Sequence, residues 1–228
     1  MNKVSPARRI VSYLLKLLVI VSALLGTYLS AEAGRKSFMG GSRVFMYFTI
    51  QSNIALAIIC AIGFVLLARK KPVGKAWHIV KFVGTVAITL TGVVFAFVLA
   101  PTLGSAAWNV QNTLTHLVVP LAGVLDFFVI SARSGIKRSS VFYAVIPPLL
   151  YAIYAGIGYV KGWQFAEGIN YPYFFLNWGS KAGAFGFSKE LPFMGTVWWI
   201  LLLLLFLIGV GFLYLCIADG IKKKSKKK

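Results

Sequence analysis

The chain is a succession of long apolar runs separated by short polar or basic connections. The runs cover about residues 10–30, 44–68, 79–100, 113–131, 141–160 and 192–217. Each is close to or above the roughly 20 residues that a helix needs to cross a bilayer. A spanning segment must satisfy its backbone hydrogen bonds internally, which favours helices. We therefore predict an all-α, polytopic membrane protein, with a bundle of six transmembrane helices in a single domain.

Composition excludes a water-soluble domain. Hydrophobic residues make up 59% of the 228 residues and charged residues only 13%, whereas about a quarter of the residues in globular chains are charged. Cys60 and Cys216 both fall inside apolar runs, so we expect buried thiols and neither a disulfide nor a metal site. The sequence indicates no metal and no other cofactor.

The formal net charge of +19 reflects where lysine and arginine are placed along the chain. Sixteen of the 24 lie in the amino-terminal stretch, the 69–78 and 132–140 loops and the basic tail at 219–228, against six in the other three connections. Because positive charge is retained on the cytoplasmic side, we predict a cell-membrane protein with both termini cytoplasmic. The expected partners are membrane lipids and not nucleic acid, and the sequence does not identify a protein partner.

A secretory signal is the alternative interpretation of the first run. Arg8 and Arg9 precede an apolar stretch, and Ala31-Glu32-Ala33 has the small-x-small pattern of a cleavage site. Cleavage would leave five spans without changing the sidedness of the others.

Polar side chains enter the membrane at the start of the second and fourth runs. Thr49 and Asn53 are four residues apart and share one helical face, and Asn112 and His116 have the same spacing. With the helical rise, Thr49 lies about 8 Å and His116 about 6 Å from the outer edge. A hydroxyl and an imidazole at matching depth can form a nucleophile–base pair for acyl transfer. The structural alternative is that both side chains only join neighbouring helices.

Prolines are expected to shape a cavity near this pair. Pro101 lacks the N–H that a continuing helix uses and is expected to close the third span. Pro120 cannot donate to the carbonyl of His116, and Pro147 and Pro148 should bend the fifth span. Such irregular backbone is tolerated in a membrane where it lines a cavity. We expect this cavity to open outward.

Asp126 tests whether a full catalytic triad is available. It lies ten residues beyond His116, about 15 Å deeper along the same helix, and cannot orient the imidazole. We expect Asp126 to pair with Arg133 or another loop cation. Neither paired charges inside the spans nor discontinuous spans in corresponding halves are evident, which disfavours a transporter. A Thr/His dyad is therefore the default arrangement if the protein is catalytic.

The longest connection, about residues 161–191, is rich in aromatic residues. Aromatic side chains favour the headgroup level of a bilayer, and long loops in compact proteins are usually functional or disordered. We expect an interfacial lid, with Tyr171, Tyr173 and Trp178 partly buried against the ends of the second and fourth spans. An aromatic belt without substrate contact is the alternative.

Several short stretches together resemble the androgen-induced membrane hydrolase family and its bacterial six-span relatives. They are Tyr47-Phe48-Thr49-Ile50-Gln51-Ser52-Asn53, Thr115-His116-Leu117-Val118-Val119-Pro120 with Asp126 following, Gly162-Trp163 and Tyr171-Pro172. The resemblance implies six spans and no soluble domain. The animal enzymes of the family hydrolyse fatty acid esters of hydroxy fatty acids with a threonine nucleophile and a histidine. By motif, this threonine falls on Thr49 and this histidine on His116.

The resemblance thus implies an integral membrane hydrolase that cleaves a lipid ester. Thr49 would be the nucleophile and His116 the base. Asn53 and Asn112 are candidate donors to the oxyanion, and Tyr171 and Trp178 are candidates for substrate contact. The alternative is a non-catalytic membrane protein, or a carrier of lipids or small molecules, whose threonine and histidine line a cavity.

Overall fold

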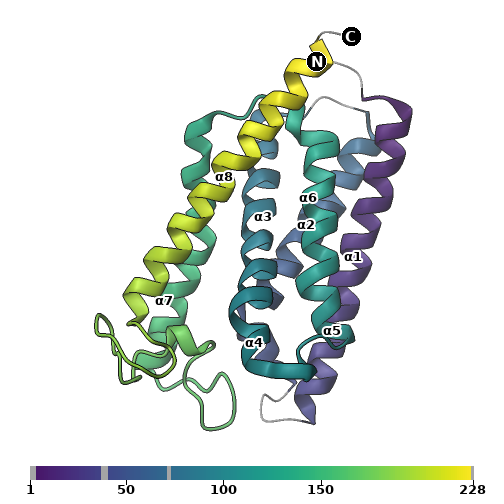
Figure 1. Ribbon diagram of the computed structural model, residues 1–228. Coiled ribbons are helices and arrows are strands. Elements are labelled where there is room, and N and C mark those ends of the chain that lie inside the picture. The colour runs from purple at the N-terminus through teal and green to yellow at the C-terminus, as the bar shows by residue number, and fades with distance from the viewer. Residues whose placement is uncertain (1–3, 37–40, 71–72, 227–228) are drawn as a thin grey trace.

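Six long helices form the fold, seen in a computed structural model that describes residues 4–36, 41–70 and 73–226 (Figure 1). Within these ranges, six helices are long and apolar enough to cross a membrane. They are Pro6–Arg35, Phe48–Ala68, Lys75–Ala106, Val110–Ile130, Arg138–Val160 and Thr196–Lys224. The expected all-α, multi-pass membrane architecture is confirmed. The beginning of the first helix and the end of the last lie at the same end of the bundle.

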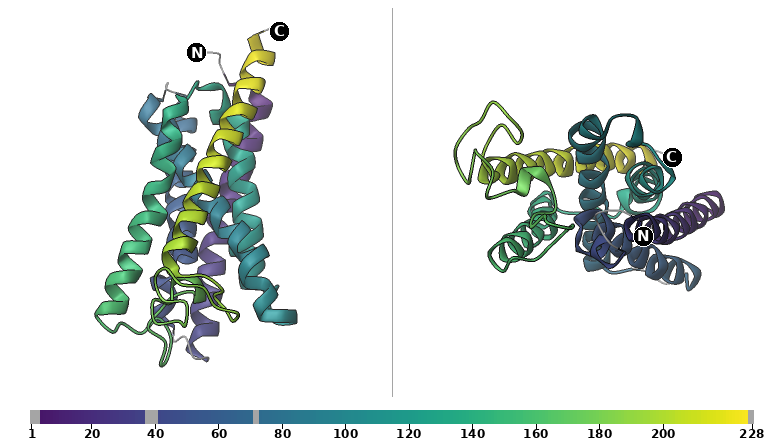
Figure 2. Two further views of the ribbon diagram at one scale, coloured as in Figure 1. Left: turned by 60° about the vertical axis from the view of Figure 1, so that its left-hand side comes forward. Right: turned by 90° about the horizontal axis from the view of Figure 1, so that it is seen from below.

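Helix α7 and the beginning of α8 lie on one side of α3, helices α1, α2 and α6 lie on the other, and α8 crosses the bundle diagonally (Figures 1 and 2). The α-helical elements are α1 (Pro6–Arg35), α2 (Phe48–Ala68), α3 (Lys75–Val94), α4 (Ala100–Leu103), α5 (Val110–Thr113), α6 (Val119–Ile130), α7 (Ile146–Val160) and α8 (Thr196–Lys226). Helices α1, α2, α3 and α6 pack against one another, and α8 contacts both α3 and α7. The connection between α7 and α8 lies at the opposite end from the start of α1.

Prolines in the third and fifth spans begin helical segments, whereas we expected them to end or bend the helices. Pro147 and Pro148 lie in the first turn of α7, directly after a 3-10 helix over Arg138–Val145. A first turn tolerates proline because its N–H groups have no acceptor within the helix. Pro101 likewise lies in the first turn of the short helix α4, and the third span continues past it to Ala106. The expectation that Pro101 closes this span is therefore wrong.

A tight apolar core joins α1, α2, α3 and α6. Its buried members are Val19, Ala23, Leu56, Ala57, Cys60, Ile88, Val119 and Ala122. Small residues among them let the helix backbones approach closely, as is usual in membrane bundles. Cys60 is a buried free thiol, as expected, whereas the free Cys216 is exposed on the surface of α8.

Three charged side chains meet inside the bundle. A carboxylate oxygen of Asp126 on α6 lies 2.6 Å from Nζ of Lys16 on α1, and the other oxygen lies 2.7 Å from Nζ of Lys81 on α3. The exposed fractions of the three side chains are 0%, 5% and 4%. We expected a loop cation such as Arg133, whose side chain lies outside the described part of the structure. The expectation that the spans hold no paired charges is wrong.

Candidate active site

Thr49 lies in the first turn of α2, which begins one residue earlier at Phe48. The N–H groups of a first turn have no acceptor within the helix. The Thr49 N–H donates instead to the hydroxyl of Tyr173, over 3.3 Å between nitrogen and oxygen. The Thr49 hydroxyl lies 3.4 Å from the Tyr173 hydroxyl and 3.3 Å from Nε2 of His116. The structure thus brings together the threonine and the histidine singled out from the sequence.

A backbone carbonyl orients the His116 ring. Nδ1 lies 3.1 Å from the carbonyl oxygen of Asn112, one turn earlier on the same helix. Because a carbonyl can only accept, this contact requires the proton on Nδ1. Nε2 then carries the lone pair and faces the Thr49 hydroxyl, which is the tautomer that a general base needs. The Thr115 hydroxyl, 3.0 Å from Nδ1, donates to the carbonyl of Gln111 and can also accept.

Two π-helical turns meet at this site. One covers Phe95–Leu99 in the third span, and the other covers Leu114–Val118 in the fourth. Such turns inside α-helices are frequent at functional sites. The ring of Phe95 stacks on the ring of His116, with centroids 3.8 Å apart and planes 20° apart. His116 is only 8% exposed, so both its position and its orientation are fixed by packing.

A glycine of α3 allows the helix of His116 to approach closely. Pro120 has no N–H to donate to the His116 carbonyl, and this carbonyl lies against Gly92. A Cβ placed at position 92 would lie 2.9 Å from the His116 carbonyl oxygen and 3.2 Å from the ring of Pro120. A larger residue at position 92 would therefore push the two helices apart and move the imidazole.

The side-chain amides of the two asparagines expected as oxyanion donors donate hydrogen bonds to backbone carbonyls. Asn53 is fully buried, and its Nδ2 donates to the carbonyls of Thr49 at 2.8 Å and Thr115 at 3.1 Å. Both hydrogens of this amide are thereby used. Nδ2 of Asn112 donates to the carbonyl of Ala107 at 2.8 Å. Asn53 thus joins α2 to the helix of His116, and Asn112 acts on the histidine through its backbone carbonyl.

Tyr173 comes from the long aromatic connection between α7 and α8. Its ring stacks on that of Phe175, with centroids 5.1 Å and planes 6° apart, and meets the ring of Tyr47 at 5.7 Å. Phe165 of the same connection is buried, and its carbonyl accepts a hydrogen bond from the Tyr47 hydroxyl. The connection therefore packs onto the start of α2. Burial raises the pKa of the Tyr173 hydroxyl, so this group keeps its proton at neutral pH.

Tyr171 and Trp178 lie outside this contact. Both are half-buried, and Trp178 lies beside Gly156 of α7. In the part of the chain that the structure describes, neither forms a hydrogen bond with Thr49. Tyr173, which we expected only to be partly buried, is the residue of this connection that contacts the threonine.

An apolar cavity of about 60 Å³ opens beside Thr49. Side chains of α2, α3, α7, α8 and the α7–α8 connection line it, among them Phe48, Leu90, Tyr173 and Leu203. Thr49 both lines the cavity and contacts His116, so its hydroxyl stands between the base and the apolar space. Such a lining suits hydrocarbon better than a charged group.

Comparison with known proteins returns no match, whether with family models, curated proteins or solved structures. The chemistry of the site is therefore inferred from the geometry of its residues. Among the described residues, no group of three or more His, Cys, Asp and Glu side chains is placed to hold a metal ion. The chemistry open to the site is that of a hydroxyl, an imidazole and a phenol beside an apolar cavity.

Proposed function

We propose that the protein is an integral membrane hydrolase that cleaves a lipid ester, with Thr49 as nucleophile and His116 as general base. The observation that carries this proposal is the 3.3 Å contact between the Thr49 hydroxyl and Nε2 of His116, whose other ring nitrogen is held by the Asn112 carbonyl. A nucleophile, a base and a group that orients the base form the minimal arrangement for covalent acyl transfer. The motif resemblance to androgen-induced membrane hydrolases points to the same two residues.

In this mechanism, the Thr49 oxygen attacks the ester carbonyl carbon while Nε2 of His116 takes the hydroxyl proton. The bond to the alcohol oxygen then breaks, and the alcohol leaves with that proton. Water attacks the resulting acyl-threonine, with His116 again as base, and releases the acid. The Tyr173 hydroxyl, 3.4 Å from the Thr49 oxygen, is the donor placed to stabilise the oxyanion.

The substrate class follows from the apolar cavity beside Thr49. Its apolar lining suits the methylene groups of an acyl chain that adjoin the ester carbonyl while the ester lies at the threonine. A fatty acid ester of a hydroxy fatty acid has this character and is the substrate type of the animal enzymes that the motifs resemble. The test is hydrolysis of such an ester by the purified protein in lipid nanodiscs. Thr49→Val, which removes the hydroxyl and keeps the side-chain shape, should abolish hydrolysis, and an unchanged rate would refute the proposal.

Replacing Tyr173 with phenylalanine should lower kcat about 10²–10³-fold, the usual effect of losing one oxyanion donor. KM should change little, because the ring that lines the cavity remains. Tyr171→Phe is the matched control, since Tyr171 is a half-buried tyrosine two positions away, and it should keep the parent kcat. Equal kcat values for Tyr173→Phe and the parent protein would exclude Tyr173 as the donor.

We place the protein in the cell membrane with both termini cytoplasmic, which puts Thr49 near the outer leaflet. The support is the concentration of lysine and arginine in the amino-terminal stretch, two connections and the tail. Reporter fusions after residue 228 and after about residue 72 should report the cytoplasm, and a fusion near Ser105 should report the outside. An external carboxyl terminus would contradict this orientation.

A carrier of lipids or small molecules is the second candidate, and the buried ion pairs favour it. Charges paired inside a membrane often mark transport pathways, and Asp126 pairs with Lys16 and Lys81. Between these ion pairs and the cavity, however, lie apolar core residues such as Leu56 and Ile88. Transport without hydrolysis by reconstituted protein, unaffected by Thr49→Val, would make the carrier the better description.

A further inference from the structure

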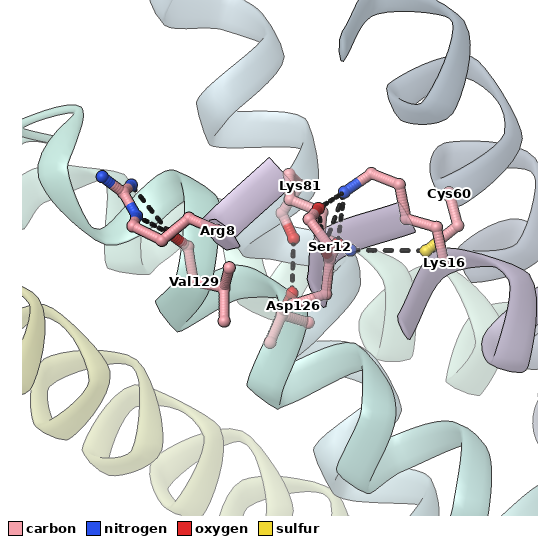
Figure 3. A network of polar contacts seen from close by, with 8 residues as sticks. Arg8, Ser12, Lys16, Cys60, Lys81, Asp126 and Val129 are labelled. Carbon is pink, nitrogen blue, oxygen red and sulfur yellow. Dashed lines mark hydrogen bonds and ion pairs between the residues drawn. The ribbon is translucent and has the colours of Figure 1, made fainter. Parts of the chain in front are cut away.

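A second polar cluster lies in the other half of the bundle from Thr49 and draws on four helices (Figure 3). Lys16 donates to both oxygens of Asp126, at 2.6 and 2.8 Å, and the Ser12 hydroxyl donates to Asp126 at 2.5 Å. Lys81 contacts Asp126 at 2.7 Å and lies 3.4 Å from the sulfur of Cys60. The proposed hydrolase mechanism uses none of these groups.

The cluster contains one basic group more than its carboxylate can balance. With ordinary ionisation, Lys16 and Lys81 carry two positive charges, Asp126 carries one negative charge and the Cys60 thiol is neutral. The three charged side chains are at most 5% exposed. An uncompensated charge in such a place is strongly unfavourable. Release of one proton makes the cluster neutral.

The hydrogen bonds indicate where that proton is missing. Nζ of Lys16 has three acceptors, namely the Ser12 hydroxyl and both Asp126 oxygens, so all three hydrogens of an ammonium are used. Nζ of Lys81 has two acceptors in the described structure, one Asp126 oxygen and the Cys60 sulfur. A neutral amine can make both contacts, by donating a hydrogen to Asp126 and by accepting the S–H proton of Cys60 through its lone pair. An ammonium at Lys81 paired with a thiolate at Cys60 has the same net charge as a neutral amine paired with a neutral thiol.

Helices α1, α2, α3 and α6 surround the cluster, and among the side chains that the structure describes few other titratable groups face it. Arg8 of α1 is bound to a backbone carbonyl of α6. His78 lies almost one turn before Lys81 on α3 and is half-buried. On the side toward the candidate active site, the apolar core residues Leu56 and Ile88 adjoin the cluster. Proton exchange is therefore expected at the end of the bundle where α1 begins.

We propose that this cluster is a proton-binding site that holds one proton fewer in the folded protein than the same groups hold in the unfolded chain. The remaining proton is shared between Nζ of Lys81 and the sulfur of Cys60, as amine and thiol or as ammonium and thiolate. Folding releases the other proton to water. Uptake of a proton, as in acid, places an unbalanced charge among α1, α3 and α6 and loosens their packing.

The test is the pH dependence of unfolding of the full-length protein in mixed micelles. The unfolded state binds one proton more, so stability must rise with pH. As the pH rises from about 6 to about 8, the unfolding equilibrium constant should fall more steeply in the parent protein than in Lys81→Met. The extra fall should be up to about tenfold for each pH unit. Lys16→Met, which also leaves one lysine for one carboxylate, should lose the same extra pH dependence. Equal profiles for the parent and both variants would overturn the proposal.

Two control variants separate the cluster from its neighbours. Lys75→Met removes an exposed lysine at the start of the same helix, and His78→Gln removes the nearby imidazole. Both should keep the pH dependence of the parent protein, and its loss in His78→Gln would assign the proton to His78 and refute the proposal.

Infrared spectroscopy tests the sharing of the remaining proton. In a Cys216→Ser background, the S–H stretching band of Cys60 should be weak or displaced, and it should become sharp after Lys81→Met. An identical band in the two proteins would refute the sharing.

Discussion

Replacing Asp126 with asparagine is expected to destabilise the bundle by about 3–5 kcal/mol, the usual result of removing one partner from a buried ion pair. The carboxylate contacts the amines of Lys16 and Lys81 at 2.6 and 2.7 Å and is fully buried. Asparagine leaves both amines without an anion inside the membrane. Unfolding in increasing dodecyl sulfate, followed by circular dichroism, measures the change. Any loss of hydrolysis in this variant would reflect loss of the fold and not of the chemistry.

Two further variants make this result specific. Asp219→Asn removes an exposed carboxylate that lies 3.7 Å from Arg138, and it should change stability by about 1 kcal/mol or less. Replacing Asp126 with leucine and both lysines with methionine should restore near-parent stability, because apolar groups of similar volume commonly substitute for buried ion pairs. An Asp126→Asn protein as stable as the parent would show that these contacts do not hold the helices together.

Replacing His116 with alanine is expected to lower kcat for ester hydrolysis about 10²–10⁴-fold, the usual contribution of a general base. Thr49→Ala should remove the acyl-enzyme route entirely. Because the two groups act as a unit, the double variant should be scarcely slower than either single variant. Initial rates with the same lipid ester, measured for parent, single and double variants, test this pattern.

The control for this series is His78→Ala, since His78 lies at the other end of the third span and outside the site. It should keep the parent kcat. Multiplicative losses in the double variant would mean that Thr49 and His116 contribute independently, as they would if both only lined a cavity.

The long helices and the proximity of Thr49 and His116 could be predicted from the sequence for a simple physical reason. Apolar runs of bilayer length have few alternatives to a spanning helix. Within such runs polar residues are rare, so helical rise alone gave the two side chains similar depths. The structure places them 3.3 Å apart.

The group that orients His116 could not be predicted, because it is the backbone carbonyl of Asn112 and every residue has one. The two π-helical turns, at Phe95–Leu99 and Leu114–Val118, also have no reliable sequence signal. Tyr173 was not separable from its aromatic neighbours, since the path of a connection without regular structure decides which ring reaches the site.

The buried ion pairs were missed although the sequence carried a signal for them. Of the 24 lysines and arginines, the connections and tails account for all but Lys16 and Lys81. Asp126 is likewise the only acidic residue within the apolar runs. Lys81 lies near the start of the third run, where a lysine can reach the interface, so its position in the sequence does not by itself indicate burial. Packing of α1 and α3 against α6 brings these three residues to one level.

The most direct test of the proposed chemistry is the location of a covalent adduct. The purified parent protein should react with a lipid-like fluorophosphonate, and mass spectrometry should place the adduct on Thr49. Thr49→Val and His116→Ala should remain unlabelled while retaining the parent circular dichroism spectrum. Ser52, whose hydroxyl bonds to the Thr49 carbonyl and to Thr91, is the nearest rival nucleophile on α2. An adduct on Ser52, or unchanged labelling of Thr49→Val, would contradict the assignment of Thr49 as nucleophile.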